Sequence, residues 1–330
     1  MVTSDYGSTN NGYIYISTNY GSTYTAVGQF NGIPDTGYSG TDTASQKWKA
    51  VAMSDSGSVI YALYEKSYSS DGIGIAISLD KGGTFSFGQL AYDALEGFRN
   101  TEYNISCSSD GSILAIYAKT GSPGMNPKFT LCVRSISSGS FNCFDPPGFF
   151  SSDQFGYIQT LSLNSVKVVS DGPTYSWSGD YNVIKTVFAA GTIQSSDVFL
   201  KKLVCTSYQQ SACSWTNIPV ASSSLMRSVI KIEANNNGST LMVLSSTETV
   251  SSSIAPATTL SVSYDYGSHF VTVANPGVSL QPPAFVTLAA TSDALKVYLF
   301  DSRSGKLFFM QKSSYSDAPE EEEEPGVTQT

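Results

Sequence analysis

Two different turn signals recur and interleave along the chain, and this repeat constrains the fold more than any other feature of the sequence. The first signal is a tight polar turn between apolar segments. It appears at Asp55-Ser56-Gly57, Asp110-Gly111, Asp171-Gly172, Asn237-Gly238 and, in a weaker form, Ser292-Asp293-Ala294. Asp-Gly and Asn-Gly between β-rich segments favour a hairpin, because these residues tolerate positive φ. Successive turns lie about 55 to 66 residues apart, which is the period of a repeated sheet unit.

A longer motif alternates with these turns and occurs three times. Residues 78–85 follow the pattern Ser-x-Asp-x-Gly-x-Thr-aromatic; residues 263–270 have His269 in place of the threonine, and residues 17–24 have asparagine in place of the aspartate. The defining residues are Ser17, Asn19, Gly21 and Tyr24, then Ser78, Asp80, Gly82 and Phe85, then Ser263, Asp265, Gly267 and Phe270. The motif resembles the Asp-box, or BNR repeat, of sialidases, sortilin-type receptors and several glycoside hydrolases.

This resemblance implies the β-propeller fold of the sialidase and sortilin superfamily. In that family the box joins the third and fourth strands of a blade at its outer edge, away from the channel where substrates bind. The Asp or Asn side chain accepts hydrogen bonds from backbone N–H groups of its own turn, the glycine supplies a left-handed residue, and the aromatic side chain packs under the hairpin. We therefore expect the box residues to be structural rather than catalytic or calcium-binding.

The two signals together predict an all-β propeller of four-stranded antiparallel blades over residues 1–315. Pairing each tight turn with the next box position gives 55 with 80, 110 with 137, 171 with 209, and 237 with 265. A fifth tight turn, near Asp293, has no good box after it, and residues 12–27 form an outer hairpin with no inner strands. We therefore expect about five blades, closed by pairing of N- and C-terminal strands. Six blades are the alternative, because 306–311 already looks like a third strand and 3–9 is a further box-like segment.

The cysteines fall where degenerate boxes are expected. Cys132 and Cys143 flank one such position, and Cys205 and Cys213 flank the next. We predict two hairpin disulfides, Cys132–Cys143 and Cys205–Cys213, which would place the protein in an oxidising compartment. The alternative is four reduced core thiols. Cys107 remains as a buried free thiol.

Composition narrows the classes of partner. Charged residues make up only 14% of the chain, against about a quarter in most soluble domains. An uncharged polar surface favours a secreted or surface-displayed protein. The 18 lysines and arginines form no basic stripe, which argues against nucleic-acid binding, and no apolar run is long enough to span a membrane. Residues 316–330, which include the run Glu320–Glu324, read as an acidic disordered tail or linker.

Catalytic signals are sparse. The single histidine, His269, lies in a box. A Ser-His-Asp triad or a histidine-rich metal site would have to use this one residue, so we expect neither, and we expect no metal and no cofactor. The four arginines do not reproduce the sialidase arginine cluster. Glu102 and Glu233 lie on expected innermost strands, where a pair about 5–10 Å apart would suit a glycoside hydrolase. The alternative is a pair of solvated carboxylates that balance Lys49 or Lys231.

The remaining candidates are surface features. Tyr175, Trp177 and Tyr181 share one long loop and could stack on sugars, anchor a partner or cover a sheet edge. Asn237 is a glycosylation acceptor in the tight turn 237–239. The sequence thus favours a non-catalytic extracellular interaction module that binds proteins or glycans at a cell surface, or a subunit of a surface or filament assembly. A glycoside hydrolase is the alternative, and a sortilin-like receptor domain ranks below it because that propeller has more blades.

Overall fold

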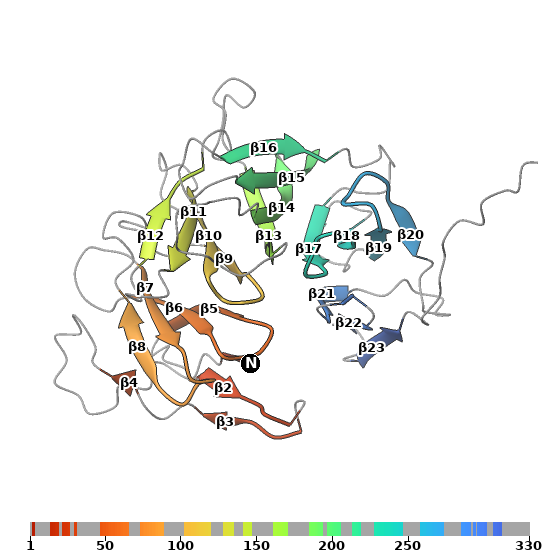
Figure 1. The fold of residues 1–330 in the computed structure, drawn as a ribbon. Helices are drawn as coiled ribbons and strands as arrows, with labels where there is room; N and C mark the ends of the chain where they lie inside the picture. Colours follow the sequence, from red (N-terminus) through yellow and green to blue (C-terminus); the bar gives the residue numbers. More distant parts are fainter. Residues whose placement is uncertain are drawn as a thin grey trace, which may run out of the picture.

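The structure is a computed structural model, and it describes the chain in segments separated by gaps. The described residues are 2–3, 14–19, 22–26, 30–31, 47–65, 73–88, 102–119, 128–134, 141–146, 161–170, 185–193, 197–205, 213–218, 228–246, 258–273, 285–291, 293–294, 296–301 and 306–311. All regular elements in these segments are β-strands, arranged around a centre as the blades of a propeller (Figure 1). Within the same segments, no helix has the length and apolarity needed to cross a bilayer.

Four consecutive sheets are complete blades, each built from four antiparallel strands in chain order. The first contains β5 (Lys47–Met53), β6 (Ile60–Glu65), β7 (Ile73–Ser78) and β8 (Phe85–Gly88), and the second contains β9 (Glu102–Cys107), β10 (Ile113–Lys119), β11 (Lys128–Arg134) and β12 (Phe141–Phe144). The third contains β13 (Leu161–Ser170), β14 (Lys185–Ile193), β15 (Asp197–Cys205) and β16 (Cys213–Asn217), and the fourth contains β17 (Ser228–Ala234), β18 (Leu241–Ser246), β19 (Thr258–Ser263) and β20 (Val271–Val273). A short strand, β4 (Phe30–Asn31), adds to the outer edge of β8 in parallel.

The first and last sheets in chain order have three strands each. The fifth blade has β21 (Phe285–Ala290), β22 (Lys296–Asp301) and β23 (Lys306–Gln311), and the N-terminal sheet has β1 (Val2–Thr3), β2 (Ile14–Ile16) and β3 (Thr25–Ala26). The all-β propeller prediction is confirmed, with β5, β9, β13, β17 and β21 as the innermost strands of five blades.

The expected closure is not among the described strand pairs. The termini form separate sheets, in which β1 pairs with β2 and β23 pairs with β22 (Figure 1). In a blade shared by both termini, the N-terminal hairpin would have to occupy the third-strand position next to β22. That position is taken by β23.

Each interface between neighbouring sheets is filled by its own apolar cluster. One cluster joins the N-terminal sheet to the first blade, and four more join successive blades. Strand β10 shows how one sequence serves two interfaces, because Ile113, Ala115 and Tyr117 face the third blade while Leu114 and Ile116 face the first. Middle strands are therefore apolar on both faces, which accounts for their nearly continuous apolar sequences.

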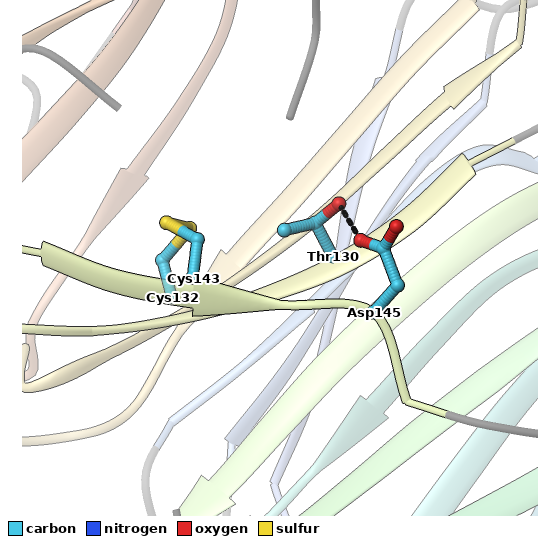
Figure 2. The surroundings of a disulfide bond; sticks show 4 residues. All are labelled: Thr130, Cys132, Cys143 and Asp145. Atoms are coloured by element: carbon cyan, nitrogen blue, oxygen red, sulfur yellow. Dashed lines mark hydrogen bonds between the residues drawn. A yellow bond between two sulfur atoms is a disulfide. The ribbon is translucent and has the colours of Figure 1, made fainter. Parts of the chain in front are cut away.

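Both predicted disulfides are present. Cys132 and Cys143 lie directly opposite each other on β11 and β12, and Cys205 and Cys213 on β15 and β16. Two residues along the same hairpin, Thr130 Oγ1 donates to Asp145 Oδ1 at 2.7 Å, so a disulfide and a hydrogen bond both tie β12 to β11 (Figure 2). Cys107 is a buried free thiol, as predicted, and burial raises its pKa to about 12. The disulfides are consistent with an extracellular or secretory location.

Candidate functional site

Three segments with the repeated motif, 17–24, 78–85 and 263–270, form the same hydrogen-bonded turn, which we call the box turn. In the second copy, Asp80 Oδ1 accepts from the Ser78 hydroxyl and the Thr84 N–H, both at 2.8 Å, and Asp80 Oδ2 accepts from the Thr84 hydroxyl at 2.7 Å. The Ser78 hydroxyl oxygen in turn accepts from the Gly82 N–H at 2.8 Å. A single aspartate thus closes the turn from both ends.

The other two box turns reproduce this arrangement with different side chains. Asp265 accepts from Ser263, from the His269 N–H at 2.9 Å and from His269 Nδ1 at 2.5 Å. Asn19 Oδ1 accepts from the Thr23 N–H at 2.9 Å, and its amide donates to the Thr23 hydroxyl at 2.8 Å. The histidine ring therefore takes over the role of the threonine hydroxyl, which is why His269 fits the motif.

Hydrogen bonding sets the charge of the two aspartates. The Thr84 N–H, followed by the hydroxyls of Thr84 and Ser78, lowers the pKa of Asp80 from 3.8 to about 2. The Ser263 hydroxyl and the His269 N–H hold the pKa of Asp265 well below its usual range. Both carboxylates are thus ionised at neutral pH and hydrogen-bonded within their own turns.

The aromatic that ends the motif packs under the hairpin in two of the three turns. Phe85 is fully buried, and Phe270 packs against the cluster between the third and fourth blades. Tyr24 departs from the expectation, since half of its surface is exposed. Its hairpin belongs to the short N-terminal sheet, whose only described apolar cluster lies on the side of the first blade. Gly21 lies outside the described residues.

Four tight turns between first and second strands, those of the first, second, fourth and fifth blades, share one geometry, which we call the inner turn; the turn predicted at Asp171-Gly172 lies outside the described residues. Each begins with a residue whose side-chain oxygen accepts the N–H of the fifth residue after it. These pairs are Ser54 with Val59 (3.0 Å), Ser108 with Ile113 (3.0 Å), Asn235 with Thr240 (2.9 Å) and Thr291 with Lys296 (3.0 Å). Sequence reasoning singled out the later Asp-Gly or Asn-Gly pair and missed this first residue. A Ser, Thr or Asn three residues before the glycine is the signal that would have found it.

Box turns and inner turns lie at the same end of the propeller, which we call the box end. The Tyr266 N–H donates to the Ser239 carbonyl at 3.1 Å, and the Lys81 N–H to the Ser58 carbonyl at 3.5 Å. Neighbouring inner turns are also linked, because the Asp55 N–H donates to the Ser109 carbonyl at 2.9 Å. The box end is therefore a hydrogen-bonded surface of turns.

The side chains at the second and fourth positions of the box turn are exposed in the copies at 78–85 and 263–270. Leu79 and Tyr264, both at the second position, are each 54% exposed, and Lys81 and Tyr266, at the fourth, are exposed as well. The Lys202 ammonium lies 5.5 Å from the Tyr266 ring centre, a cation–π contact that helps to orient this tyrosine. Binding residues are often found on loops that a rigid scaffold holds in place.

The two candidate channel carboxylates lie on the innermost strands β9 and β17, and their pairing stays a prediction. Glu233 forms an ion pair of 2.9 Å with Lys167 on the neighbouring blade. Burial alone would lower the pKa of Lys167, but the charge and hydrogen bond of Glu233, together with the charge of Asp55, outweigh it and the pKa is raised. Glu102 precedes its inner turn, at Ser108, by six residues, whereas Glu233 precedes Asn235 by two. The four-residue offset corresponds to about 13 Å along the strands. The structure describes the backbone of Glu102 but not its side chain.

Other predicted site residues fall as follows. Tyr175, Trp177 and Tyr181 lie outside the described residues, as do residues 316–330. Asn237 is exposed on its inner turn, where its Oδ1 accepts from the Ser239 N–H, so its glycosylation stays a prediction. Among the described residues, no group of three or more metal-ligating side chains comes together.

Comparisons with known proteins assign neither a family nor an activity to this chain. No protein-family model matches the chain, and no curated protein does. Solved structures with a similar arrangement include prolyl oligopeptidase B from Galerina marginata, at 8% identity and a TM-score of 0.48, over 80% of this chain and 32% of that one. They also include a GH43 β-1,3-galactosidase (9% identity, TM-score 0.41, 83% and 97% covered) and the polysaccharide lyase Uly1 (12%, 0.41, 83% and 70%). The chain spans about a third of the length of the prolyl oligopeptidase, and such identities say nothing of activity.

Proposed function

We propose that this protein is a non-catalytic extracellular interaction module of the Asp-box, or BNR, propeller type, and that its box end is the contact surface. The family assignment is supported by three turns that share one hydrogen-bond pattern around Asn19, Asp80 and Asp265. An extracellular setting is supported by the two disulfides and by the low content of charged residues.

The observation that carries the proposal is the exposure of large apolar side chains on turns that cannot easily move. Leu79, Tyr264 and Tyr266 would lose little conformational freedom on binding, because their backbone is already fixed by the box hydrogen bonds. Aromatic side chains of this kind contribute strongly to protein and glycan interfaces. Glu233 is ion-paired with Lys167, which favours a structural role for this carboxylate over a catalytic one.

A binding assay on the intact protein tests the proposal. Immobilised cell-wall polysaccharides and extracellular glycoproteins are the probes, and we expect binding to at least one of them with the probe left chemically unchanged. Replacing Leu79, Tyr264 and Tyr266 together by serine should abolish binding without lowering the melting temperature by more than a few degrees.

Leu307→Ser is the matched control, because Leu307 is 64% exposed but lies at the start of β23, near the opposite end of the propeller. Binding should survive this change. Shortened oligosaccharides in the assay mixture, or binding that is indifferent to the triple substitution, would count against the proposal.

A further inference from the structure

A polar groove lies between the first and second box turns, where the N-terminal sheet meets the first blade. Its volume is about 390 Å³, within the range of about 300–1,000 Å³ that is usual for small-molecule sites. The groove is lined by Ile16, Thr18, Thr23, Thr25, Ala26, Asp80, Lys81, Gly82 and Gly83. We propose that it binds a neutral carbohydrate, an inference that rests on the proposed function and narrows it to one site and one class of ligand.

Both walls of the groove are held in place before any ligand arrives. Asn19 fixes the first box turn through its two contacts with Thr23, and Asp80 fixes the second through Ser78 and Thr84. The two turns meet closely because Gly82 has no side chain. A Cβ at Gly82 would lie 2.0 Å from Ile16 Cδ1, so any other residue would force the end of the Ile16 side chain to move. A preorganised groove loses little entropy on binding.

The hydroxyl groups of the groove suit a polyhydroxylated ligand. Thr18, Thr23 and Thr25 each offer a group that can both donate and accept, as sugar hydroxyls do. The Thr23 oxygen already accepts from the Asn19 amide, so its proton remains to be donated. Ile16 and Ala26 provide small apolar surfaces for the C–H groups of a sugar ring.

The charges of the groove favour a neutral ligand over an ionic one. Asp80 stays ionised, because its turn lowers its pKa to about 2, and its carboxylate repels an anion. Lys81, next to it in the chain, contributes the opposite charge and repels a cation. Since the two charges sum to zero, the groove gains little by binding a sulfate, phosphate or uronate group.

Ligand-observed saturation-transfer NMR on the full chain tests this inference with defined probes. Cellotetraose, laminaritetraose and xylotetraose are the neutral probes, and tetragalacturonate is the acidic one. We expect at least one neutral tetrasaccharide to bind, with a Kd on the order of 0.1–1 mM, because polar contacts in an open groove each add little net affinity. Tetragalacturonate should bind at least tenfold more weakly.

Two sets of variants assign any binding to the groove. The double variant Thr18→Val, Thr25→Val keeps side-chain shape and removes two hydroxyls, so we expect affinity to fall at least fivefold. The matched control is Thr272→Val, an exposed threonine on the outermost strand of the fourth blade, which should change nothing.

The outcomes separate this inference from the function on which it rests. No binding of any neutral tetrasaccharide, equal or tighter binding of tetragalacturonate, or an unaffected double variant would each overturn the groove as a neutral-carbohydrate site. If the probes of the previous section still bind through Leu79, Tyr264 and Tyr266, the interaction module stands without this site. If those probes are instead cleaved, the proposed function fails as well.

Discussion

Replacing Gly111 with alanine measures how tightly neighbouring blades pack at the box end. Gly111 is the left-handed residue of the second inner turn, with φ of 71°, and its carbonyl accepts a hydrogen bond from the buried Tyr61 hydroxyl of the first blade. A Cβ built on Gly111 would lie 2.5 Å from Val59 Cβ and under 3.0 Å from both of its methyl groups. Val59 is buried on the first blade, so neither partner can move without disturbing the interface.

The structure supplies its own control for the size of this effect. Gly57 occupies the same place in the first inner turn, with φ of 70°, but a Cβ there meets only Met53 Sδ at an ordinary 3.6 Å. Gly57→Ala should therefore cost only the left-handed strain of about 1–2 kcal/mol. Ala294, at φ of 58° in the last inner turn, shows that alanine can take this conformation. Gly111→Ala adds overpacking of about 1–3 kcal/mol, for a total of about 2–5 kcal/mol.

Thermal unfolding followed by tryptophan fluorescence is a sufficient assay. At roughly 2 °C per kcal/mol for a chain of this size, Gly111→Ala should melt some 2–6 °C below Gly57→Ala. Equal melting temperatures for the two variants would refute the reasoning, because they would mean that the second inner turn is not pressed against Val59. The double variant Gly111→Ala, Val59→Ala should recover part of the loss relative to Val59→Ala alone, since it removes the clashing methyl groups.

Three further predictions concern the turns, the disulfides and the ion pair. The pKa of Asp80 is 3.8 in the unfolded chain and about 2 in the folded chain. The ionised carboxylate therefore stabilises the fold above pH 4, and this contribution is lost as the pH falls toward 2. Asp80→Asn keeps the turn, as Asn19 does, and should make the fall in melting temperature over this window shallower. Cys132→Ser, Cys143→Ser opens a link across a sequence separation of 11 and should cost about 2–3 kcal/mol, against little change for Cys107→Ala, with urea unfolding as the measurement. Glu233→Gln leaves Lys167 without its carboxylate partner and should cost about 1–3 kcal/mol, whereas Lys231→Gln on the same strand should stay within about 0.5 kcal/mol.

The sequence was sufficient to predict the features that depend on local turn chemistry. Each box turn is closed by side chains within a few residues of one another, so its pattern survives in the sequence, even where His269 replaces threonine. The disulfides were predictable for a related reason, since a pair of cysteines around a short turn can only face each other across a hairpin. Cys132 and Cys143 are direct partners in the register of β11 and β12.

Contacts between different blades could not be predicted from the sequence. Lys167 and Glu233 are 66 residues apart and come together only because β13 and β17 are neighbouring inner strands. The predicted pairing of N- and C-terminal strands is not found among the described strands, because β23 continues the fifth blade and the sequence alone did not show which blade it joins. The groove was missed for the same reason, since it exists only where Ile16 of one sheet rests on Gly82 of another.

Some positions of the box turn hold the turn together, and others carry the exposed side chains of the box end. The first, third, fifth and seventh positions are fixed by hydrogen bonds within the turn, so a change there costs stability. The side chains at the second and fourth positions are exposed on the same turn, and they are Leu79 and Lys81 in one copy and Tyr264 and Tyr266 in another. The fourth position is held at φ of about 60° in both copies, so its backbone is constrained while its side chain is not. Substitution at the second position should therefore alter binding at almost no cost in stability, and substitution at the fourth should be tolerated best by residues that accept a left-handed backbone. A set of turns with this division can change what it binds without changing how it folds.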